Sequence, residues 1–398
     1  MRAPIIVTFL SFIGFAVVYP VLPFQALALG ASAQGVTALL VVEPLVAALL
    51  APLVGSLSDR IGRRPVVLLL LALALPAYLL LAMADALWLL FASRLLAGAS
   101  TAVSPVIQAY LADVTSKDDR ILGMAGVNAA FCLAFIVGPV ITTTALGPDG
   151  TDYATTALAG AAAALAAVLL AGVCLAEPRR TLAAEPAEAA KPANRPGRER
   201  PFAALVRAGC LLPVLALSIL GLVYAAMDTT LGLWFDETSG WGARELSFAF
   251  AIAGAAAFIA LCVIRRLTAP LGEAAAAAVC AIAMGLGFLA LLLAGGWIGL
   301  ASAMALLGAG MAVGTSCLQS LISKAAPADS QGLVLGQADA LFTASSIVGP
   351  LAAGFAFEQL HVASPYAAAA VLSLLAALLL ARNARASETT PASQPEQG

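Results

Sequence analysis

The sequence predicts an all-α membrane protein with twelve transmembrane helices in two parallel-repeat six-helix bundles. Apolar residues make up 62% of the 398 positions and charged residues only 11%, whereas a water-soluble domain has roughly a quarter charged residues. The basic residues gather almost entirely on one side of the expected membrane. The two halves of the chain also share a sequence repeat. These three observations exclude a soluble domain and predict a chain surrounded by lipid.

The chain contains twelve apolar segments, and crossing a bilayer takes about 20 apolar residues. They lie at residues 5–24, 37–57, 66–84, 88–112, 121–145, 154–175, 208–233, 246–264, 273–294, 297–322, 332–356 and 364–381. With the N-terminus inside, every Lys and Arg falls in a cytoplasmic segment except Arg94, within a span, and Arg244, in an outer loop. The positive-inside rule favours this asymmetry, and an odd number of spans in either half would destroy it. Both termini are therefore expected in the cytoplasm.

One long polar stretch divides the chain near its middle. Residues 176–206 mix Pro, Ala and both charges without apolar periodicity, which predicts a cytoplasmic linker. The linker separates an N-terminal bundle at 1–175 from a C-terminal bundle at 207–382. Residues 383–398 are expected to form a disordered tail.

The two halves are related by a repeat at a constant offset of 211 residues (319 − 108). Gln108 matches Gln319, and the run Ile136–Pro139 matches Ile347–Pro350 without a gap between them. Each half has an even number of spans, so both copies have the same orientation in the membrane. Parallel repeats of this kind describe one transporter architecture, in which the substrate binds between the halves near the midplane.

The loop between the second and third spans carries the most specific motif, GSLSDRIGRRP at residues 55–65. Gly55 and Gly62 are expected to let two helices approach closely. A plain positive-inside anchor would explain the arginines but not the spacing of glycine, acid and arginine. The charged residues that fix the helix ends at the interface are Asp59, Arg60, Arg63 and Arg64.

This loop resembles the signature loop of the major facilitator superfamily, in which an acid and arginines latch the cytoplasmic ends of the two halves. The resemblance implies that Asp59 faces the start of span eleven, near Gln331 and Gly332. It also implies that Arg63 pairs with Asp113 at the inner end of span four. The latch is therefore the expected role of the loop.

Other stretches look like tetracycline/proton antiporters and their multidrug relatives, among them YPVLP at 19–23 and QGLVLGQADALFTASSIVGPL at 331–351. The likeness implies a bacterial inner membrane. Those tetracycline exporters have an acid in span one, where this chain has Ser11, and a histidine in span eight, where it has none. Proton coupling is therefore expected to use other groups.

Span four contains RLLAGASTA, which begins at Arg94 and places Gly98 one turn later. An unpaired arginine in a span costs about 2.5–3.5 kcal/mol on the insertion scale, and Glu43 lies at comparable depth in span two. The superfamily's drug/proton antiporters have an arginine and a glycine at these places, so the resemblance implies a functional role. Two alternatives stay open: a purely structural Glu43–Arg94 pair, and an arginine that snorkels to the outer interface.

Spans five and eleven each contain a Gly-Pro pair, which breaks the helical hydrogen-bond ladder and permits bending. We expect a hinge at Gly138-Pro139 and at its repeat mate Gly349-Pro350. The pattern around the first pair resembles the span-five signature of superfamily efflux antiporters. That signature has glycine at three places where this chain has Ala134, Thr142 and Thr143.

Two further acids lie within spans, Asp228 in span seven and Asp339 in span eleven. An ionised carboxylate is costly in apolar surroundings, so acids there are default candidates for carrying protons. Asp339 is expected to be buried, whereas Asp228 is either buried or at a wet outer end. The proton-coupling candidates are thus Asp339, Asp228, Glu43 and Arg94. The substrate-cavity candidates are Asn128, Gln108 and Gln319, of which Asn128 is the repeat mate of Asp339.

The sequence therefore predicts a secondary active transporter that exports a drug-like small molecule, of tetracycline or multidrug type, in exchange for protons by alternating access. We expect a monomer in the lipid bilayer, driven by the proton gradient, with no cofactor, metal site, nucleic-acid partner or enzymatic activity. The alternative is a superfamily transporter that imports or exports a native metabolite such as a sugar or an organic acid. A non-transporting membrane receptor is the third reading.

Overall fold

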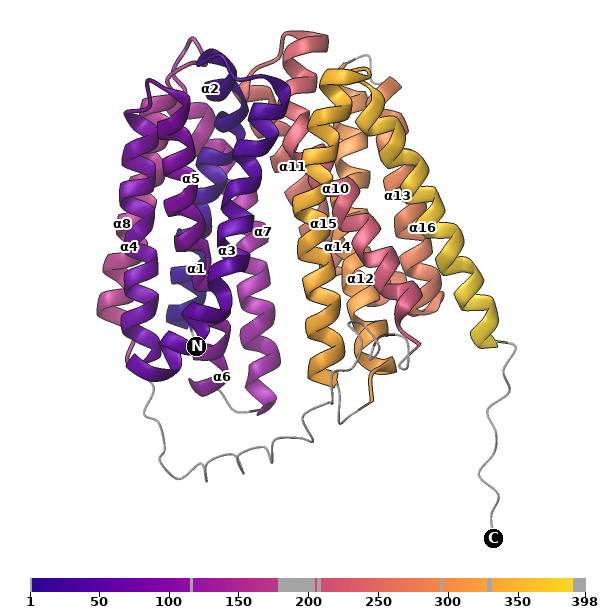
Figure 1. Ribbon diagram of the computed structural model, residues 1–398. Coiled ribbons are helices and arrows are strands. Elements are labelled where there is room, and N and C mark those ends of the chain that lie inside the picture. The colour runs from indigo at the N-terminus through magenta and orange to yellow at the C-terminus, as the bar shows by residue number, and fades with distance from the viewer. Residues whose placement is uncertain are drawn as a thin grey trace. The chain divides into compact units, whose positions relative to one another are not determined.

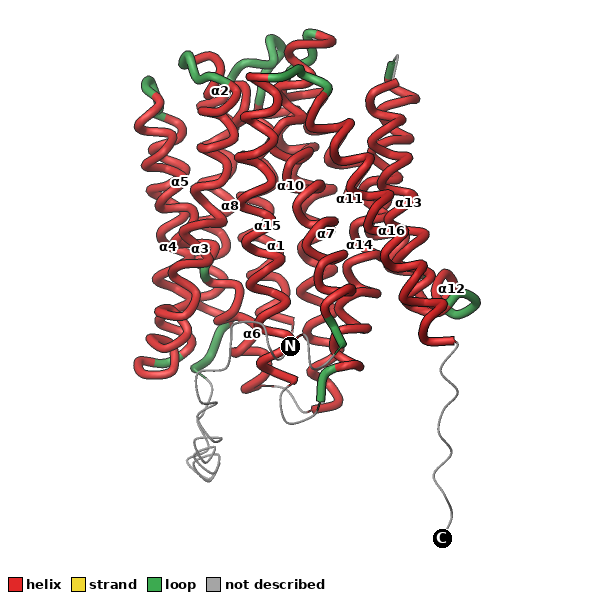
Figure 2. Tube along the Cα trace, turned by 45° about the vertical axis from the view of Figure 1, so that its right-hand side comes forward, coloured by secondary structure: helices red, strands yellow, loops and turns green. Residues whose placement is uncertain are grey.

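The computed structural model describes residues 2–114, 117–177, 205, 209–293, 296–327 and 331–388. Within these ranges, the description leaves out the side chains of residues 2, 117–125, 128, 331–332 and 382–388. The described chain consists of helices and contains no strand (Figure 1, Figure 2). The predicted all-α class is confirmed.

Among the described residues, eleven helices are long and apolar enough to cross a membrane, and a shorter apolar helix, Ala129–Ala145, corresponds to the remaining predicted span. The elements of the first half are α1 (Arg2–Val18), η1 (Tyr19–Val21), α2 (Leu22–Ala28), α3 (Ala33–Ile61), α4 (Arg63–Ala82), α5 (Leu87–Thr101), α6 (Val103–Val114), α7 (Lys117–Ala145) and α8 (Tyr153–Cys174). Those of the second half are α10 (Leu211–Ser239), α11 (Ala243–Cys262), α12 (Ile264–Thr268), α13 (Gly272–Leu293), α14 (Trp297–Ala325), α15 (Gln331–Gln359) and α16 (Ser364–Glu388). Span four is therefore built from two helices, α5 and α6.

Several helices extend beyond the apolar segments, because a helix continues until a residue caps or turns the backbone. α3 begins after Ser32, whose hydroxyl accepts a hydrogen bond from the Gly35 amide over 3.2 Å. It ends at Gly62, where φ is 105°, a conformation that strongly favours glycine. The ends of α3 are thus set by the cap at Ser32 and the turn at Gly62, and not by where the apolar segment begins and ends.

The two polar segments predicted from composition are largely outside the described residues. Of the predicted linker at 176–206, the structure describes only residues 176, 177 and 205. α16 continues past the predicted end of the bundle to Glu388, because the sequence there is rich in alanine and arginine, which are good helix formers. Residues 389–398 lie outside the description.

The chain forms two compact units, and each is described by itself. Unit 1 comprises Met1–Arg200, Ala226–Ala255 and Pro350–Ser364; unit 2 comprises Pro201–Ala225, Ala256–Gly349 and Pro365–Gly398. In unit 1, α1 packs against α7 and α8, α4 packs against α5 and α8, and α3 packs against α5. In unit 2, α13 and α14 pack along each other, and Gly310 lets them come close.

Unit 1 includes two segments from the second half of the chain because they pack on first-half helices. A Cβ at Gly232 would lie 2.9 Å from the Pro23 ring. The Gln34 amide donates to a Glu358 carboxylate oxygen over 3.0 Å. The predicted halves divide only at the linker, whereas the compact units divide there and also within α10, α11 and α15 and at the start of α16.

Candidate functional site

A buried ion pair joins α5 to α3 in unit 1. Arg94 Nη1 donates to Glu43 Oε2 over 3.0 Å, and Arg94 Nη2 donates to Ser93 Oγ over 3.1 Å. The two side chains of the pair are 1% and 7% exposed. Arg94 therefore does not snorkel to an interface, and that alternative is wrong. The expected Glu43–Arg94 contact is present, while its role in coupling stays a prediction.

Gly98 explains how α5 comes close enough to α3 for this pair to form. It follows Arg94 by four residues, so both residues lie on one face of α5. A Cβ at Gly98 would lie 2.7 Å from the Glu43 carbonyl oxygen and 2.7 Å from the Val46 side chain. Small residues at such crossings let two backbones approach. Arg94 and Gly98 of the RLLAGASTA motif thus both contact Glu43 of α3, one through its side chain and the other by close backbone packing.

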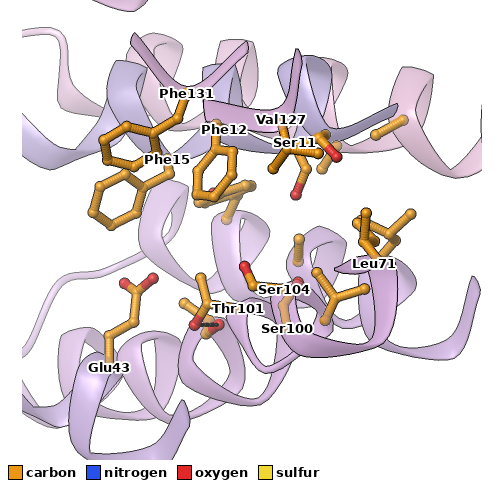
Figure 3. Close-up of a pocket in the computed structure, with 18 of the residues that line it drawn as sticks. Ser11, Phe12, Phe15, Glu43, Leu71, Ser100, Thr101, Ser104, Val127 and Phe131 are labelled. Carbon is orange, nitrogen blue, oxygen red and sulfur yellow. Dashed lines mark hydrogen bonds between the residues drawn. The ribbon is translucent and has the colours of Figure 1, made fainter. Parts of the chain in front are cut away.

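The Glu43 side chain borders a cavity of about 130 Å³ inside unit 1, lined by helices α1 and α3–α8. Phe12, Phe15 and Phe131 gather on one side, and the Glu43 carboxylate points toward Phe15 (Figure 3). A drug-sized ligand needs roughly 300–1,000 Å³, whereas a single water occupies about 30 Å³ of liquid. The cavity of unit 1 therefore suits a few waters or one small chemical group.

Hydroxyl groups supply most of the polar lining of this cavity. They belong to Thr8, Ser11, Tyr78, Ser100, Thr101 and Ser104. Ser11 is the position at which the resembled exporters have an acid, and it faces the same cavity as Glu43 on another helix. Gln108, a predicted cavity residue, also lines it. Asn128, the other candidate of this half, has a side chain outside the described residues.

The two Gly-Pro pairs mark places where α7 and α15 pack closely against the first helix of their own half. A Cβ at Gly138 would lie 2.5 Å from the Ala16 Cβ in α1, and one at Gly349 would collide with the Leu222 carbonyl in α10. Both helices continue through Pro139 and Pro350. The contacts account for the glycines, and hinge motion stays a prediction.

Thr142, one of the departures from the antiporter signature, has a packing role of its own. Its hydroxyl lies 2.8 Å from the Val17 carbonyl oxygen of α1 and 3.0 Å from the Gly138 carbonyl oxygen of its own helix. It is fully buried. The hydroxyl thus supplies a polar link between α7 and α1 next to the Gly-Pro pair, where the signature glycine would supply none.

In the signature loop, Arg63 bridges two acids. Its guanidinium lies 2.8 Å from Asp59 Oδ1 and 3.0 Å from Asp113 Oδ2, and it donates to the Ser58 hydroxyl over 2.6 Å. The contact with Asp113 that the resemblance implies is therefore present. The side chains of residues 331–332 lie outside the description, so the implied proximity of Asp59 to span eleven stays a prediction.

Glu177 completes this loop, and sequence reasoning missed it because it was assigned to the linker. Its carboxylate accepts hydrogen bonds from the amides of Arg63 and Arg64 over 2.7 and 2.9 Å, which caps the N-terminus of α4. A Cβ at Gly62 would lie 2.7 Å from the same carboxylate. Gly62 thus makes room for a cap. An acid directly after the sixth span was the available signal.

The remaining loop residues behave differently from one another. Arg64 Nη2 donates to the Gly172 carbonyl over 2.6 Å, which ties the loop to the end of α8. Arg60 is exposed. At Gly55 an added Cβ would meet no atom of the described chain within 4 Å, so the close approach expected there stays a prediction. Only Gly62 of the two glycines is required by its surroundings.

Asp228 accepts a hydrogen bond from the Tyr19 hydroxyl over 2.5 Å, and both residues are partly buried in unit 1. The Tyr19 ring lies 5.0 Å from the Phe15 ring and 5.8 Å from the Phe250 ring. Asp228 is thus neither isolated nor at a fully wet end. Sequence reasoning missed Tyr19, although it stands in the YPVLP run.

Asp339 contradicts the sequence expectation, because its side chain is exposed rather than buried. It lies on the wall of a cavity of about 330 Å³ in unit 2, together with Gln319 and Phe342. Hydropathy places the residue within the span but does not tell which face of α15 it occupies. The structure brings Asp339 and Gln319 to one cavity, and their roles in coupling and substrate binding stay predictions.

The chain was compared with known protein families and curated relatives. A family model described as the Major Facilitator Superfamily matches residues 5–342 and residues 276–398. The class C tetracycline resistance protein of Escherichia coli is 31% identical over 363 residues, which cover 86% of this chain and 85% of that protein. The class B protein of Escherichia coli is 38% identical over 143 residues, which cover 35% of this chain and 36% of that protein.

Solved structures share the fold. A D-xylose–proton symporter matches with a TM-score of 0.76 at 16% identity and covers 95% of this chain and 96% of its own. The human organic anion transporter MFSD10 matches with a TM-score of 0.65 at 22% identity, with 95% and 98% covered. At these identities the structures speak for the fold alone. The family match over nearly the whole chain, with the 31% identical class C relative, shows that this multi-pass membrane protein belongs to the major facilitator superfamily of transporters.

Proposed function

We propose that the protein is a proton-coupled antiporter that exports a drug-like small molecule of tetracycline or multidrug type by alternating access. It acts as a monomer in a bacterial inner membrane with both termini in the cytoplasm, and it has no enzymatic step. The observation that carries the proposal is the buried Glu43–Arg94 pair on the wall of an aromatic and hydroxyl-lined cavity. Similarity to tetracycline resistance proteins over most of the chain supports the substrate class.

The energetics of antiport require a group that binds a proton in one state and releases it in the other. Each pH unit of gradient offers about 1.36 kcal/mol per proton, and each 100 mV of potential about 2.3 kcal/mol more. Glu43 can act as this group, because a proton on its carboxylate removes the negative charge that attracts the Arg94 guanidinium. Breaking a buried pair strands a charge, so proton binding favours a rearrangement of α3 against α5.

Two other acids remain candidates for the same role. Asp228 can exchange its hydrogen bond with Tyr19 for a proton, and Asp339 lines a cavity that is open to solvent. A drug-sized substrate needs a larger space than the cavity of unit 1 provides. The hydroxyls and Gln108 supply hydrogen-bonding groups in that cavity, and Gln319 supplies one in the cavity of unit 2.

Drug accumulation in cells that lack their own efflux pumps tests the proposal. Expression should lower the accumulation of tetracycline or of another amphiphilic drug, and collapse of the proton gradient should abolish the effect. A Glu43→Gln/Arg94→Gln variant that reaches the membrane in equal amount should be inactive and serves as the matched control. Energy-dependent uptake of a sugar or an organic acid, with no drug phenotype across a panel, would instead support the metabolite transporter.

A further inference from the structure

An apolar groove on unit 2 lies beside two exposed arginines. The short helix α12 carries Arg265 and Arg266, both exposed, and neither has an ion-pair partner among the described residues. α12 contacts α13 and lies at one end of the unit 2 helices (Figure 2). The groove has a volume of about 170 Å³, and its walls come from α11, α12, α13, α14 and the turn after α12. α12 contributes to both features, since its Leu267 lines the groove.

All residues that line the groove are apolar, and they include several that unit 2 leaves uncovered. Leu267, Leu271 and Val279 are 45%, 50% and 51% exposed. At the floor α13 and α14 pack closely, since a Cβ at Gly310 would lie 3.0 Å from the Cys280 carbonyl oxygen. The exposed leucine and valine side chains border this floor, so the groove is apolar on every side that the described residues form. A polar solute would find nothing there to orient it.

We propose that this groove and the two arginines bind one anionic phospholipid, of which a few methylenes of an acyl chain occupy the groove and the phosphate contacts Arg265 and Arg266. The argument is charge complementarity combined with shape. An arginine presents a planar fork of donors that matches phosphate oxygens, and basic clusters at the cytoplasmic ends of spans attract anionic lipids. The predicted topology places this end of α12 on the cytoplasmic side. One phospholipid can fill the apolar groove with part of an acyl chain and neutralise the two arginines with its phosphate.

A nearby cation provides a contrast. Lys324 Nζ lies 2.7 Å from Glu273 Oε1, so its charge is already neutralised by a carboxylate. Glu273 also accepts a hydrogen bond from Ser320 over 2.9 Å. On this side of unit 2, Arg265 and Arg266 are therefore available to a phosphate, whereas Lys324 is not. Lys324→Gln removes one positive charge from the same unit without touching the groove.

The test uses the full chain in nanodiscs that contain equal amounts of phosphatidylglycerol and phosphatidylcholine, followed by native mass spectrometry of the lipids that stay bound. The wild type should retain phosphatidylglycerol in preference to phosphatidylcholine. Arg265→Gln/Arg266→Gln should reduce that preference about tenfold or more, since each basic residue near an anionic surface contributes appreciably. Lys324→Gln should leave it unchanged. Ala309→Leu, which fills the groove but keeps the arginines, should lower the amount of both retained lipids.

Each outcome decides the matter. Equal retention of both lipids by the wild type overturns the proposal without any variant, and so does an undiminished preference in the double arginine variant. Because both arginines are exposed, the double variant should elute from a sizing column like the wild type. If it does not, the wild-type comparison still decides. Ala309→Leu decides as well, because undiminished retention of both lipids by this variant would overturn the proposal. The inference does not depend on the transported substrate, so a failed drug assay leaves it standing.

Discussion

The cavities of the two units are lined by matching positions of the sequence repeat, but their acids are placed differently. The pairs of repeat mates that line them are Gln108 and Gln319, Val127 and Ala338, and Phe131 and Phe342. In unit 1 the acid is Glu43, which is buried and paired with Arg94. In unit 2 it is Asp339, which is exposed. The repeat thus keeps the positions that shape a cavity and not those that carry charge.

This difference lets the stabilising role of a buried acid and the proposed coupling role of an exposed acid be tested separately. A buried charge needs its partner, since removal of one partner leaves the other uncompensated. An exposed acid has no such requirement, because water solvates its charge. The predictions below are ordered by their expected effect on the stability of the purified protein, from the largest to the smallest.

The largest effect is expected for Glu43→Gln alone. It leaves the Arg94 guanidinium buried without a counter-charge, which costs about 3–5 kcal/mol. The double variant Glu43→Gln/Arg94→Gln should lose less than the sum of the two single variants, because no charge is stranded. Thermal unfolding of the purified variants, followed by tryptophan fluorescence, measures this coupling. Strictly additive losses would show that the two side chains do not depend on each other.

The next effect concerns the glycines of the two Gly-Pro pairs, where the units should behave alike. Gly138→Val and Gly349→Val both force a side chain into the backbone or Cβ of a neighbouring helix, and such overpacking typically costs about 1–3 kcal/mol. Gly336→Ala is the control, since a Cβ at Gly336 would meet no atom of the described chain within 4 Å. Similar melting temperatures for the wild type and Gly349→Val would show that the two Gly-Pro pairs do not contribute equally to stability.

A smaller effect on stability is expected in the signature loop. Asp59→Asn removes one exposed ion pair of Arg63, which contributes at most about 1 kcal/mol, and Asp113 still holds the arginine. Transport should nevertheless fall steeply if the loop latches the two halves, while the protein stays inserted and abundant. Drug efflux normalised to the amount of membrane protein measures this, with Ser56→Ala as the control. If Asp59→Asn exports drug at the wild-type rate, the loop serves only to fix the orientation of the spans in the membrane.

The spans and the charged motifs could be predicted from sequence because both depend on strong, local physical rules. Apolar length and basic asymmetry define the helices, and a buried arginine requires an acid at similar depth, which led to Glu43. The exposure of Asp339 could not be predicted, because hydropathy does not tell which face of a helix meets a cavity. Glu177 was assigned to the linker since composition there is polar, and only the geometry of α4 reveals its capping role.

The smallest effect on stability and the sharpest on function are expected for Asp339→Asn. The amide has nearly the shape of the protonated acid, and substitutions of an exposed side chain usually change stability by less than about 0.5 kcal/mol. Antiport requires that proton and drug bias the same equilibrium, and a permanently neutral side chain cannot do so. The variant should therefore lose proton-driven efflux in vesicles but keep drug binding and downhill exchange. If Asp339→Asn concentrates drug against a gradient as well as the wild type does, the proton is carried elsewhere, and the buried Glu43 and the hydrogen-bonded Asp228 are the acids left to carry it.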